Sequence, residues 1–259
     1  MKINFLGTSA GWPLPRLGCH CKICTSKDPK DKRLRSSILI NDAILIDSGI
    51  DFYHQFLRAK KPIIDSVFIS HVHPDHYFGL WDVSHLMSSK PTIYLSLENQ
   101  KSIVKRINDL TITFLLKKAK NFNHSQPIKT SNLQITPFLV NHSTNTETYG
   151  FQASKNDKTF VYIPDFRNIP RSSQKFCRKA DVIIFDGSSI KPAGPKRWGH
   201  ISIKESTSLA KKLKAKKVYY THIGHGPKSG THQELEAFVQ KHGGKNFHIA
   251  FDGLRTVLE

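Results

Sequence analysis

The stretch that decides the fold is Ser66-Val67-Phe68-Ile69-Ser70-His71-Val72-His73-Pro74-Asp75-His76. Its first half is a short apolar run typical of a buried strand. Its second half places three imidazoles and one carboxylate within six residues, a density that favours a bound divalent cation over a merely polar loop. In an extended segment His71 and His73 point to the same side, whereas Asp75 and His76 lie beyond the turn at Pro74. The spacing therefore predicts two metal ions rather than one.

Ligand-type residues also follow other apolar runs. Five of them in all stand after predicted strands: His71, His73, His142, Asp165 and His222. Because neighbouring strand ends meet at one edge of a sheet, we expect these side chains to converge on one pocket. A single histidine after a strand would carry little weight, but this set predicts a metal site.

A second concentration of ligands lies near the N-terminus, where Cys19, Cys21 and Cys24 occupy six residues. No secretory signal precedes them, so a metal is favoured over disulfides. Three thiolates need a fourth ligand for a closed structural zinc site, and that ligand comes either from a distant segment or from His20. The alternative is a cluster of reduced, buried cysteines, which Lys22 and the charged residues that follow argue against.

Length and composition bound the architecture and the partners. The chain has 259 residues, 38% of them hydrophobic, so we expect a single domain over residues 1–259. Its first apolar run is too short for a signal peptide, and no run approaches the ~18 residues that span a bilayer, so we expect a cytoplasmic protein without membrane contact. The net charge, 39 minus 20 or +19, favours anionic substrates or nucleic acid, although the lysines at 211–217 could equally be a solvated helix end.

The hydrophobic periodicity alternates between strands and helices, and the two β-rich halves are consistent with two packed sheets. We predict strands at 3–6, 36–40, 43–46, 66–70, 92–96, 133–140, 150–154, 159–163, 182–185 and 218–220, with two short strands around Asp252. We predict helices at 52–59, from Gly79 through Met87, at 171–180, at 202–213 and after 231. Capping boxes open the last two helices, at Ser202 to Glu205 and at Thr231 to Glu234.

The quoted stretch matches, position for position, the His-x-His-x-Asp-His motif of the metallo-β-lactamase superfamily, and the chain resembles that superfamily. The resemblance implies an α/β (α+β) fold, the αββα four-layer sandwich, with a two-metal hydrolase site. It implies that a water or hydroxide bridging the two ions is the nucleophile. It assigns one metal to His71, His73 and His142, the other to Asp75, His76 and His222, and a bridging role to Asp165.

Within the superfamily, the chain resembles the cyclic phosphodiesterases of phosphonate degradation, which act on 5-phosphoribosyl 1,2-cyclic phosphate. Those proteins pair a Cys-x-Cys-x-x-Cys loop with a histidine three residues after the last catalytic one. The resemblance implies a structural zinc in the loop at 18–25, two active-site Zn²⁺ or Mn²⁺ ions, a small anionic phosphodiester as substrate and a tendency to form homodimers. It assigns the structural zinc to Cys19, Cys21, Cys24 and His225.

Two residues are predicted to be catalytic, Asp75 and His200. A phosphodiester has a poor leaving group, and the family places a histidine at the position of His200, as general acid or as donor to the phosphoryl oxygens. The alternative for His200 is an exposed loop histidine beside Trp198. Its place ahead of the helix at 202–213 leads us to expect that the helix dipole disfavours its cationic form. Asp47, at a strand end, is either a turn carboxylate or a partner of a ligating histidine.

Four other functions fit parts of the sequence. An RNA or DNA nuclease of the same superfamily would explain the charge, but the sequence shows no insertion comparable to the Gly/Pro-rich arm of the tRNA-processing members. A lactone or thioester hydrolase would use the same metals without a phosphate clamp. An accessory protein of pyrroloquinoline quinone biosynthesis would share the cysteine loop. A non-catalytic nucleic-acid-binding protein is disfavoured by the intact ligand set.

Overall fold

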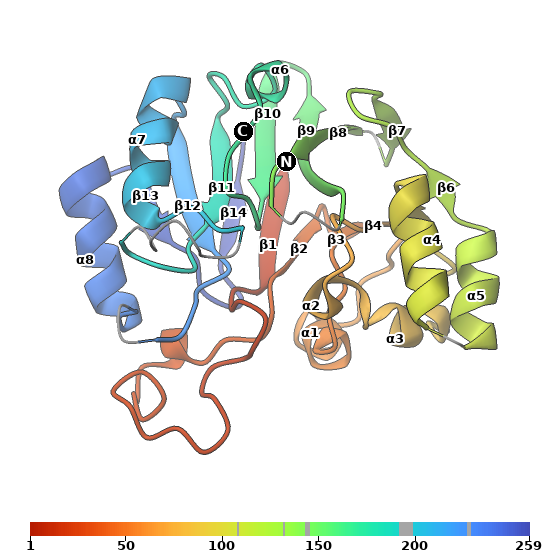
Figure 1. Cartoon of the computed structure of the whole chain (residues 1–259), viewed down its shortest axis with the longest axis horizontal. Coiled ribbons are helices and arrows are strands. Elements are labelled where there is room, and N and C mark those ends of the chain that lie inside the picture. Colours follow the sequence, from red (N-terminus) through yellow and green to blue (C-terminus); the bar gives the residue numbers. More distant parts are fainter. Residues whose placement is uncertain (108, 132, 143–145, 192–198, 227–228) are drawn as a thin grey trace.

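Two seven-stranded sheets form the centre of the protein in a computed structural model, with helices outside them (Figure 1). The structure describes residues 1–107, 109–131, 133–142, 146–191, 199–226 and 229–259. Helices α7 and α8 lie on one side of the sheets and α1 to α5 on the other (Figure 1). This arrangement confirms the predicted αββα sandwich.

The first sheet is mixed. Its strands β3, β4, β5 and β6 run parallel to one another, whereas β14, β1, β2 and β3 alternate in direction. In spatial order the strands are β14 (Arg255–Val257), β1 (Lys2–Gly7), β2 (Ser37–Ile40), β3 (Ile44–Ile46), β4 (Ser66–Phe68), β5 (Thr92–Leu95) and β6 (Lys120–Asn121).

The second sheet is also mixed. Strands β10 to β13 are parallel, and β7 to β10 alternate in direction. In spatial order the strands are β13 (Phe247–Ile249), β12 (Lys217–Thr221), β11 (Val182–Asp186), β10 (Lys158–Ile163), β9 (Thr148–Lys155), β8 (Leu133–Val140) and β7 (Ile128–Thr130). Strand β11 is buried throughout, as expected of a parallel strand covered on both faces.

Helices cover both outer faces. Against the first sheet lie α1 (Phe52–Arg58), α2 (Pro74–Tyr77), α3 (Leu80–Ser84), α4 (Leu97–Arg106) and α5 (Leu110–Lys117). Against the second lie α6 (Arg171–Gln174), α7 (Ile203–Leu213) and α8 (His232–Gly243), and a 3₁₀ turn, η1 (Pro29–Asp31), follows the cysteine loop. Both predicted capping boxes are present, at the starts of α7 and α8.

Three apolar clusters hold the layers together. The central cluster takes side chains from both sheets, among them Phe5 and Phe68 from the first and Phe151 and Ile184 from the second. The other two clusters lie between each sheet and its own helices. Burial of this apolar area is the main stabilising contribution, and it fixes the edge at which the strand ends meet.

Two predicted helices are too long. The helix predicted at 171–180 ends at Gln174, and turns with a left-handed Lys179 bury Cys177 and Ala180 instead. The helix predicted through Met87 ends at Ser84, and Met87 is fully exposed. In both places the spacing of apolar residues predicted a longer helix than the chain forms. Helices α4 and α5 were not predicted.

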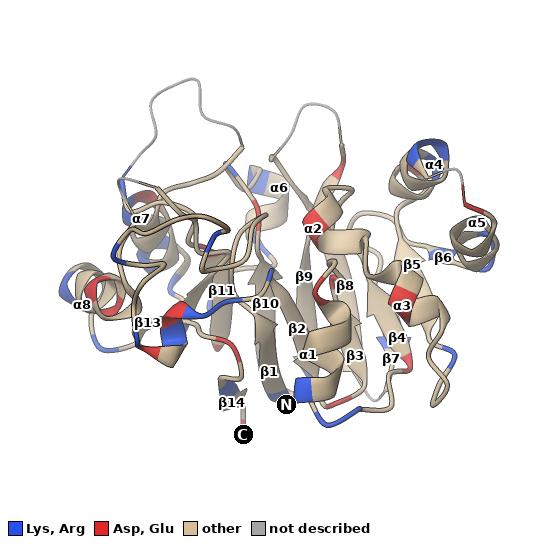
Figure 2. Cartoon of the chain, turned by 90° about the horizontal axis from the view of Figure 1, so that it is seen from below, with Lys and Arg blue, Asp and Glu red and all other residues tan. Residues whose placement is uncertain are grey.

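Positive charge is spread over the outer layers. Figure 2 shows Lys and Arg on α4, α5, α6 and α8 as well as on loops. Lys211 and Lys212 are exposed in the last turn of α7, as the solvated-end interpretation expects. No helix in the part of the chain that the structure describes is long and apolar enough to cross a membrane.

A buried arginine joins the segment after the cysteine loop to the C-terminal part of the chain. The Arg33 guanidinium donates to the Ala250 carbonyl at 2.6 Å and to Thr8 Oγ1 at 2.8 Å, and it lies 3.1 Å from His232 Nδ1. Because arginine only donates, His232 Nδ1 must accept. Burial, and after it the positive charge of Arg33, lower the pKa of His232 to about 4. A neutral His232 is therefore part of the folded state.

This contact predicts an acid-sensitive component of stability. The pKa of His232 is lowered from 6.5 to about 4 on folding, so the unfolded chain binds more protons in that interval. The free energy of unfolding should fall as pH falls through this window, and His232→Gln should reduce the fall. Urea unfolding of metal-stripped protein across that range measures it, with His54→Gln on the exposed face of α1 as the control. Identical pH dependence in wild type and His232→Gln would contradict the assignment.

Candidate metal centre

The predicted ligands lie at one edge of the two sheets because of where the strands end. His71 follows β4, and Pro74 starts α2 with His73 as its N-cap, so Asp75 and His76 stand in one helical turn. On the second sheet, β10, β11 and β12 are parallel and in register, so the residues that follow them emerge together. The expectation that the strand ends converge is confirmed.

The first group of ligand atoms contains His71, His73, His142 and Asp165, all mutually within 4.8 Å. His73 Nδ1 lies 2.9 Å from His71 Nε2 and 3.2 Å from His142 Nε2. Asp165 Oδ2 lies 3.3 Å from His71 Nε2. Three nitrogens and one carboxylate oxygen thus face a common point.

The second group contains Asp75, His76, His222 and the same Asp165. His76 Nε2 lies 3.1 Å from Asp75 Oδ2 and 3.1 Å from Asp165 Oδ2. His222 Nε2 lies 3.0 Å from Asp165 Oδ1. Asp165 is therefore shared between the groups, in the position that a bridging carboxylate would need.

The chemistry of the two groups fits divalent cations. His76 Nε2 and Asp165 Oδ1 are buried, and although ligand atoms lie 3.0 to 3.1 Å from them, none among the described residues is aligned for a hydrogen bond. Such an arrangement is costly unless a cation lies between these atoms. Burial is the main reason that the pKa of His71 lies well below its usual range, and the charge of the neighbouring His76 lowers it further. Burial also lowers the pKa of His73 to about 4. Neutral imidazoles are the form that binds metal.

The carboxylates also favour a cation. Burial alone would raise the pKa of Asp165, but His222 and His76 hold it well below its usual range. Burial alone would lower the pKa of His76, but Asp75, Asp47 and Asp165 raise it well above its usual range. Three carboxylates around one buried imidazole create a demand for positive charge, which Zn²⁺ or Mn²⁺ could meet with these nitrogen and oxygen ligands.

Asp47 orients two of the ligand histidines, His76 directly and His71 through Ser70. Its Oδ2 lies 2.8 Å from His76 Nδ1 and accepts the Ser70 hydroxyl at 2.9 Å, while Oδ1 accepts the Ser70 backbone N–H at 2.8 Å. Ser70 Oγ in turn lies 2.9 Å from His71 Nδ1. These contacts occupy the Nδ1 atoms and leave Nε2 free for a metal. Of the two interpretations of Asp47, the structure supports the partner of a histidine.

His200 is held beside both groups. Its Nδ1 lies 2.6 Å from Oδ2 of the fully buried Asp186, and its ring centroid lies 4.8 Å from that of His142 and 5.3 Å from that of His222. Burial opposes the charged ring, but Asp186 outweighs it and raises the pKa of His200 to about 9. The expectation that the helix dipole disfavours the cation is therefore wrong, because a carboxylate at hydrogen-bond distance outweighs the dipole.

Asp186 is the residue of this site that sequence reasoning missed. It ends β11 between the strands that lead to Asp165 and His222, and its Oδ1 accepts the Ser188 backbone N–H at 2.8 Å. The signal was present, because Asp186 is also a carboxylate directly after an apolar strand.

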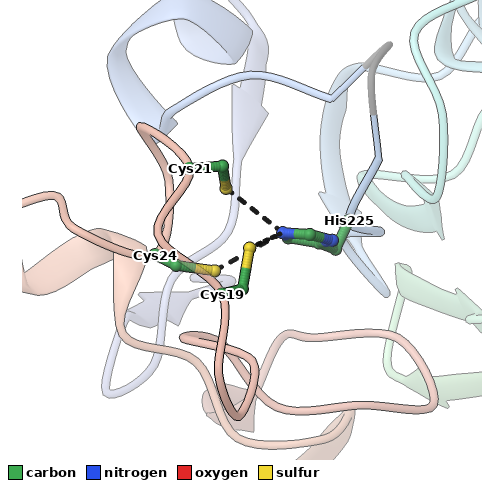
Figure 3. A group of neighbouring side chains, drawn as sticks. All are labelled: Cys19, Cys21, Cys24 and His225. Atoms are coloured by element: carbon green, nitrogen blue, oxygen red, sulfur yellow. Dashed lines mark hydrogen bonds between the residues drawn. The ribbon is translucent and has the colours of Figure 1, made fainter.

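The three cysteines of the N-terminal loop surround one histidine (Figure 3). The Sγ atoms of Cys19, Cys21 and Cys24 lie 3.4, 3.2 and 3.4 Å from His225 Nε2. A hydrogen bond from the Cys24 backbone, with His225 contributing, lowers the pKa of Cys21 to about 6, whereas burial raises that of Cys24. Cys19 and Cys21 are half-exposed, which argues against a buried, reduced cluster. His225 stands where the fourth ligand was expected; His20 belongs to no ligand group among the described residues.

These groups predict the metal content. Purified protein should hold about one tightly bound zinc and up to about two exchangeable ions per chain, because a Cys₃His site is closed and the His/Asp site has an open face. Elemental analysis before and after dialysis against a chelator measures this. Cys19→Ser should lose the tight zinc and lower the melting temperature, with Cys177→Ala as a control for removing a thiol elsewhere. A Cys19→Ser protein that kept both would contradict the structural-site assignment.

Comparison with known proteins places the chain in a family. Residues 42–223 match the family model described as a beta-lactamase superfamily domain. An octanoyltransferase of Porphyromonas gingivalis is 25% identical over all of this chain, although the chain spans only 52% of that protein. A ribonuclease Z of Thermoplasma volcanium is 23% identical over 86% of each chain. The solved structure of a diphosphatase from the PhnP family superposes with a TM-score of 0.82 at 27% identity, over 100% of this chain and 98% of that one. The protein therefore belongs to the metallo-β-lactamase superfamily.

Proposed function

We propose that the protein is a dinuclear phosphodiesterase that hydrolyses a small phosphodiester, such as a sugar cyclic phosphate. The observation that carries the proposal is the Asp186–His200 pair, which places a proton donor beside two adjoining groups of metal ligands. The likeness to a diphosphatase of the PhnP family supports a phosphate substrate. The predicted single domain and homodimer remain predictions.

The proposed ligands divide as the family resemblance implies. His71, His73 and His142 would hold one ion, Asp75, His76 and His222 the other, and Asp165 both. When bound, the two cations neutralise the phosphate charge and activate a water as nucleophile. Besides binding metal, Asp75 carries a negative charge that helps to raise the pKa of His200, which favours the charged imidazole.

His200 would supply the proton. Asp186 occupies Nδ1, so Nε2 is the atom that can release a proton to the departing oxygen. Asp186 favours the charged form of the His200 ring by raising its pKa, which suits a general acid. Asp186 acts through His200 and is a positioning residue.

A nuclease is the second candidate, and two observations favour it. The chain aligns with a ribonuclease Z over 86% of its length, and its net charge is +19. The described lysines at the end of α7 have no neighbouring aromatic side chains in their own segment, so base stacking is not provided there. The small diester is therefore the preferred substrate class.

A substrate screen tests the proposal. Metal-loaded protein should hydrolyse bis(p-nitrophenyl) phosphate and ribose cyclic phosphates faster than p-nitrophenyl phosphate, lactones, thioesters or short RNA. His73→Ala and Asp165→Ala should abolish all turnover, whereas His85→Ala, at an exposed site, should not. Comparable rates on the monoester and the diester would count against a diesterase, and faster acyl hydrolysis would favour the lactone or thioester alternative.

A leaving-group series isolates His200. A general acid contributes roughly 10²–10⁴-fold when the leaving group is a poor one. His200→Ala should therefore reduce the rate strongly for an alkyl diester and little for a p-nitrophenyl diester. Asp186→Asn should shift the rates in the same direction by a smaller factor. Equal losses on both substrates would indicate phosphoryl-oxygen binding or a structural role instead.

Salt dependence separates a small substrate from nucleic acid. Each phosphate contact to a single strand contributes a slope of about −0.7 in log affinity against log salt. The catalytic efficiency on a ribose cyclic phosphate should show a shallow slope that neutralising the lysines at 211–217 leaves unchanged. Faster RNA cleavage with a steep slope that disappears with those lysines would establish the nuclease.

A further inference from the structure

The two groups of proposed metal ligands share one short segment of chain. His222 faces Asp165 in the active-site group, and His225 faces the three cysteine sulfurs (Figure 3). Only Ile223 and Gly224 separate them. A shift of one histidine is therefore transmitted to the other through two residues.

The connecting residues have little freedom. The Ile223 backbone donates to the Thr8 carbonyl at 2.8 Å and accepts from the Ala10 N–H at 3.0 Å, and its side chain is buried. A Cβ on Gly224 would lie 2.1 Å from the Ser188 carbonyl oxygen, so this backbone is packed against its neighbour. A segment that is hydrogen-bonded and closely packed in this way is rigid, so the positions of its two histidines depend on each other.

His222 itself is held in an unfavourable conformation. Its φ is +56°, in the left-handed region that side chains other than glycine seldom adopt. Its N–H donates to Ser36 Oγ at 3.0 Å, one of the contacts that hold it there. A strained residue persists only where its surroundings over-determine it.

We propose that Cys19, Cys21 and Cys24 act through His225 to position His222, so that occupancy of the thiolate site sets the metal affinity of the Asp75–His76–His222 position. The inference rests on the proposed ligand roles. It is selective, because the three histidines that belong only to the other position follow β4 and β8 and are not attached to this segment, and Asp165 is the one ligand that both positions share. Loss of the thiolate-bound metal should weaken one active-site position and spare the other.

Manganese binding tests the selectivity. Mn²⁺ prefers nitrogen and oxygen ligands over thiolates, so electron paramagnetic resonance of a Mn²⁺ titration follows the active-site positions alone. In Cys21→Ser protein, one Mn²⁺ position should weaken roughly 10–100-fold, the usual effect of removing support behind a ligand. The other position should match wild type. Cys177→Ala, which removes a buried thiol that belongs to none of the ligand groups among the described residues, should leave both unchanged.

A double-mutant cycle tests the route. If the effect passes through His222, Cys21→Ser should cause no further loss in a His222→Ala background. It should keep its full effect in a His142→Ala background, where the Asp75–His76–His222 position remains. Equal weakening of both positions in Cys21→Ser, or an effect that survives His222→Ala, would show general destabilisation and overturn the proposal.

A thiol reagent covers the case in which Cys21→Ser does not fold. An organomercurial should react with the half-exposed Cys19 and Cys21 of folded wild type, and circular dichroism confirms that the fold is retained. The same selective loss of one Mn²⁺ position is expected. Unchanged Mn²⁺ binding after zinc release would refute the positioning role while leaving the diesterase proposal intact, whereas absent diester turnover in fully loaded protein would refute only the latter.

Discussion

The structure depends on one buried carboxylate that several imidazoles share. Asp165 is 1% exposed, and its two oxygens lie within 3.0 to 3.3 Å of nitrogens from His71, His76 and His222. Asp165 belongs to both groups of side chains that could hold a metal ion. The packing of the two sheets brings the end of β4 in one sheet close to the ends of β10 and β12 in the other. The apolar core between the sheets stabilises that alignment.

The local part of this design could be predicted from the sequence. The stretch from His71 to His76 is contiguous, so its ligand density and the turn at Pro74 are visible without a fold. The sandwich followed from strand periodicity together with the family resemblance. What could not be predicted depends on contacts between distant segments. The pKa of His200 reverses direction because Asp186, fourteen positions away, lies against it. The helix expected at 171–180 stops early because turns bury Cys177 and Ala180, and the helix expected through Met87 stops at Ser84 and leaves Met87 exposed.

The lysines and arginines of the protein and its proposed reactive groups lie in different parts of the structure. Lysine and arginine lie on the outer helices (Figure 2). The groups that would bind metal and move protons instead follow the strand ends, and most of them are buried. The thiolate loop is different, because it reaches these strand ends through His225, three residues from His222. One loop after β12 therefore contributes a histidine to each of two ligand groups. In the proposed coupling, this shared loop connects residues near position 20 to a centre built from β-strand ends.

The most direct test of the account is anomalous diffraction from crystals of the zinc-loaded protein. We predict two zinc peaks about 3.5–4 Å apart, one on each side of Asp165, as in two-metal hydrolytic sites. We also predict a third peak among Cys19, Cys21, Cys24 and His225. A single peak at the sheet edge, or a pair that does not include Asp165 as a shared ligand, would contradict the dinuclear centre on which the proposed chemistry rests.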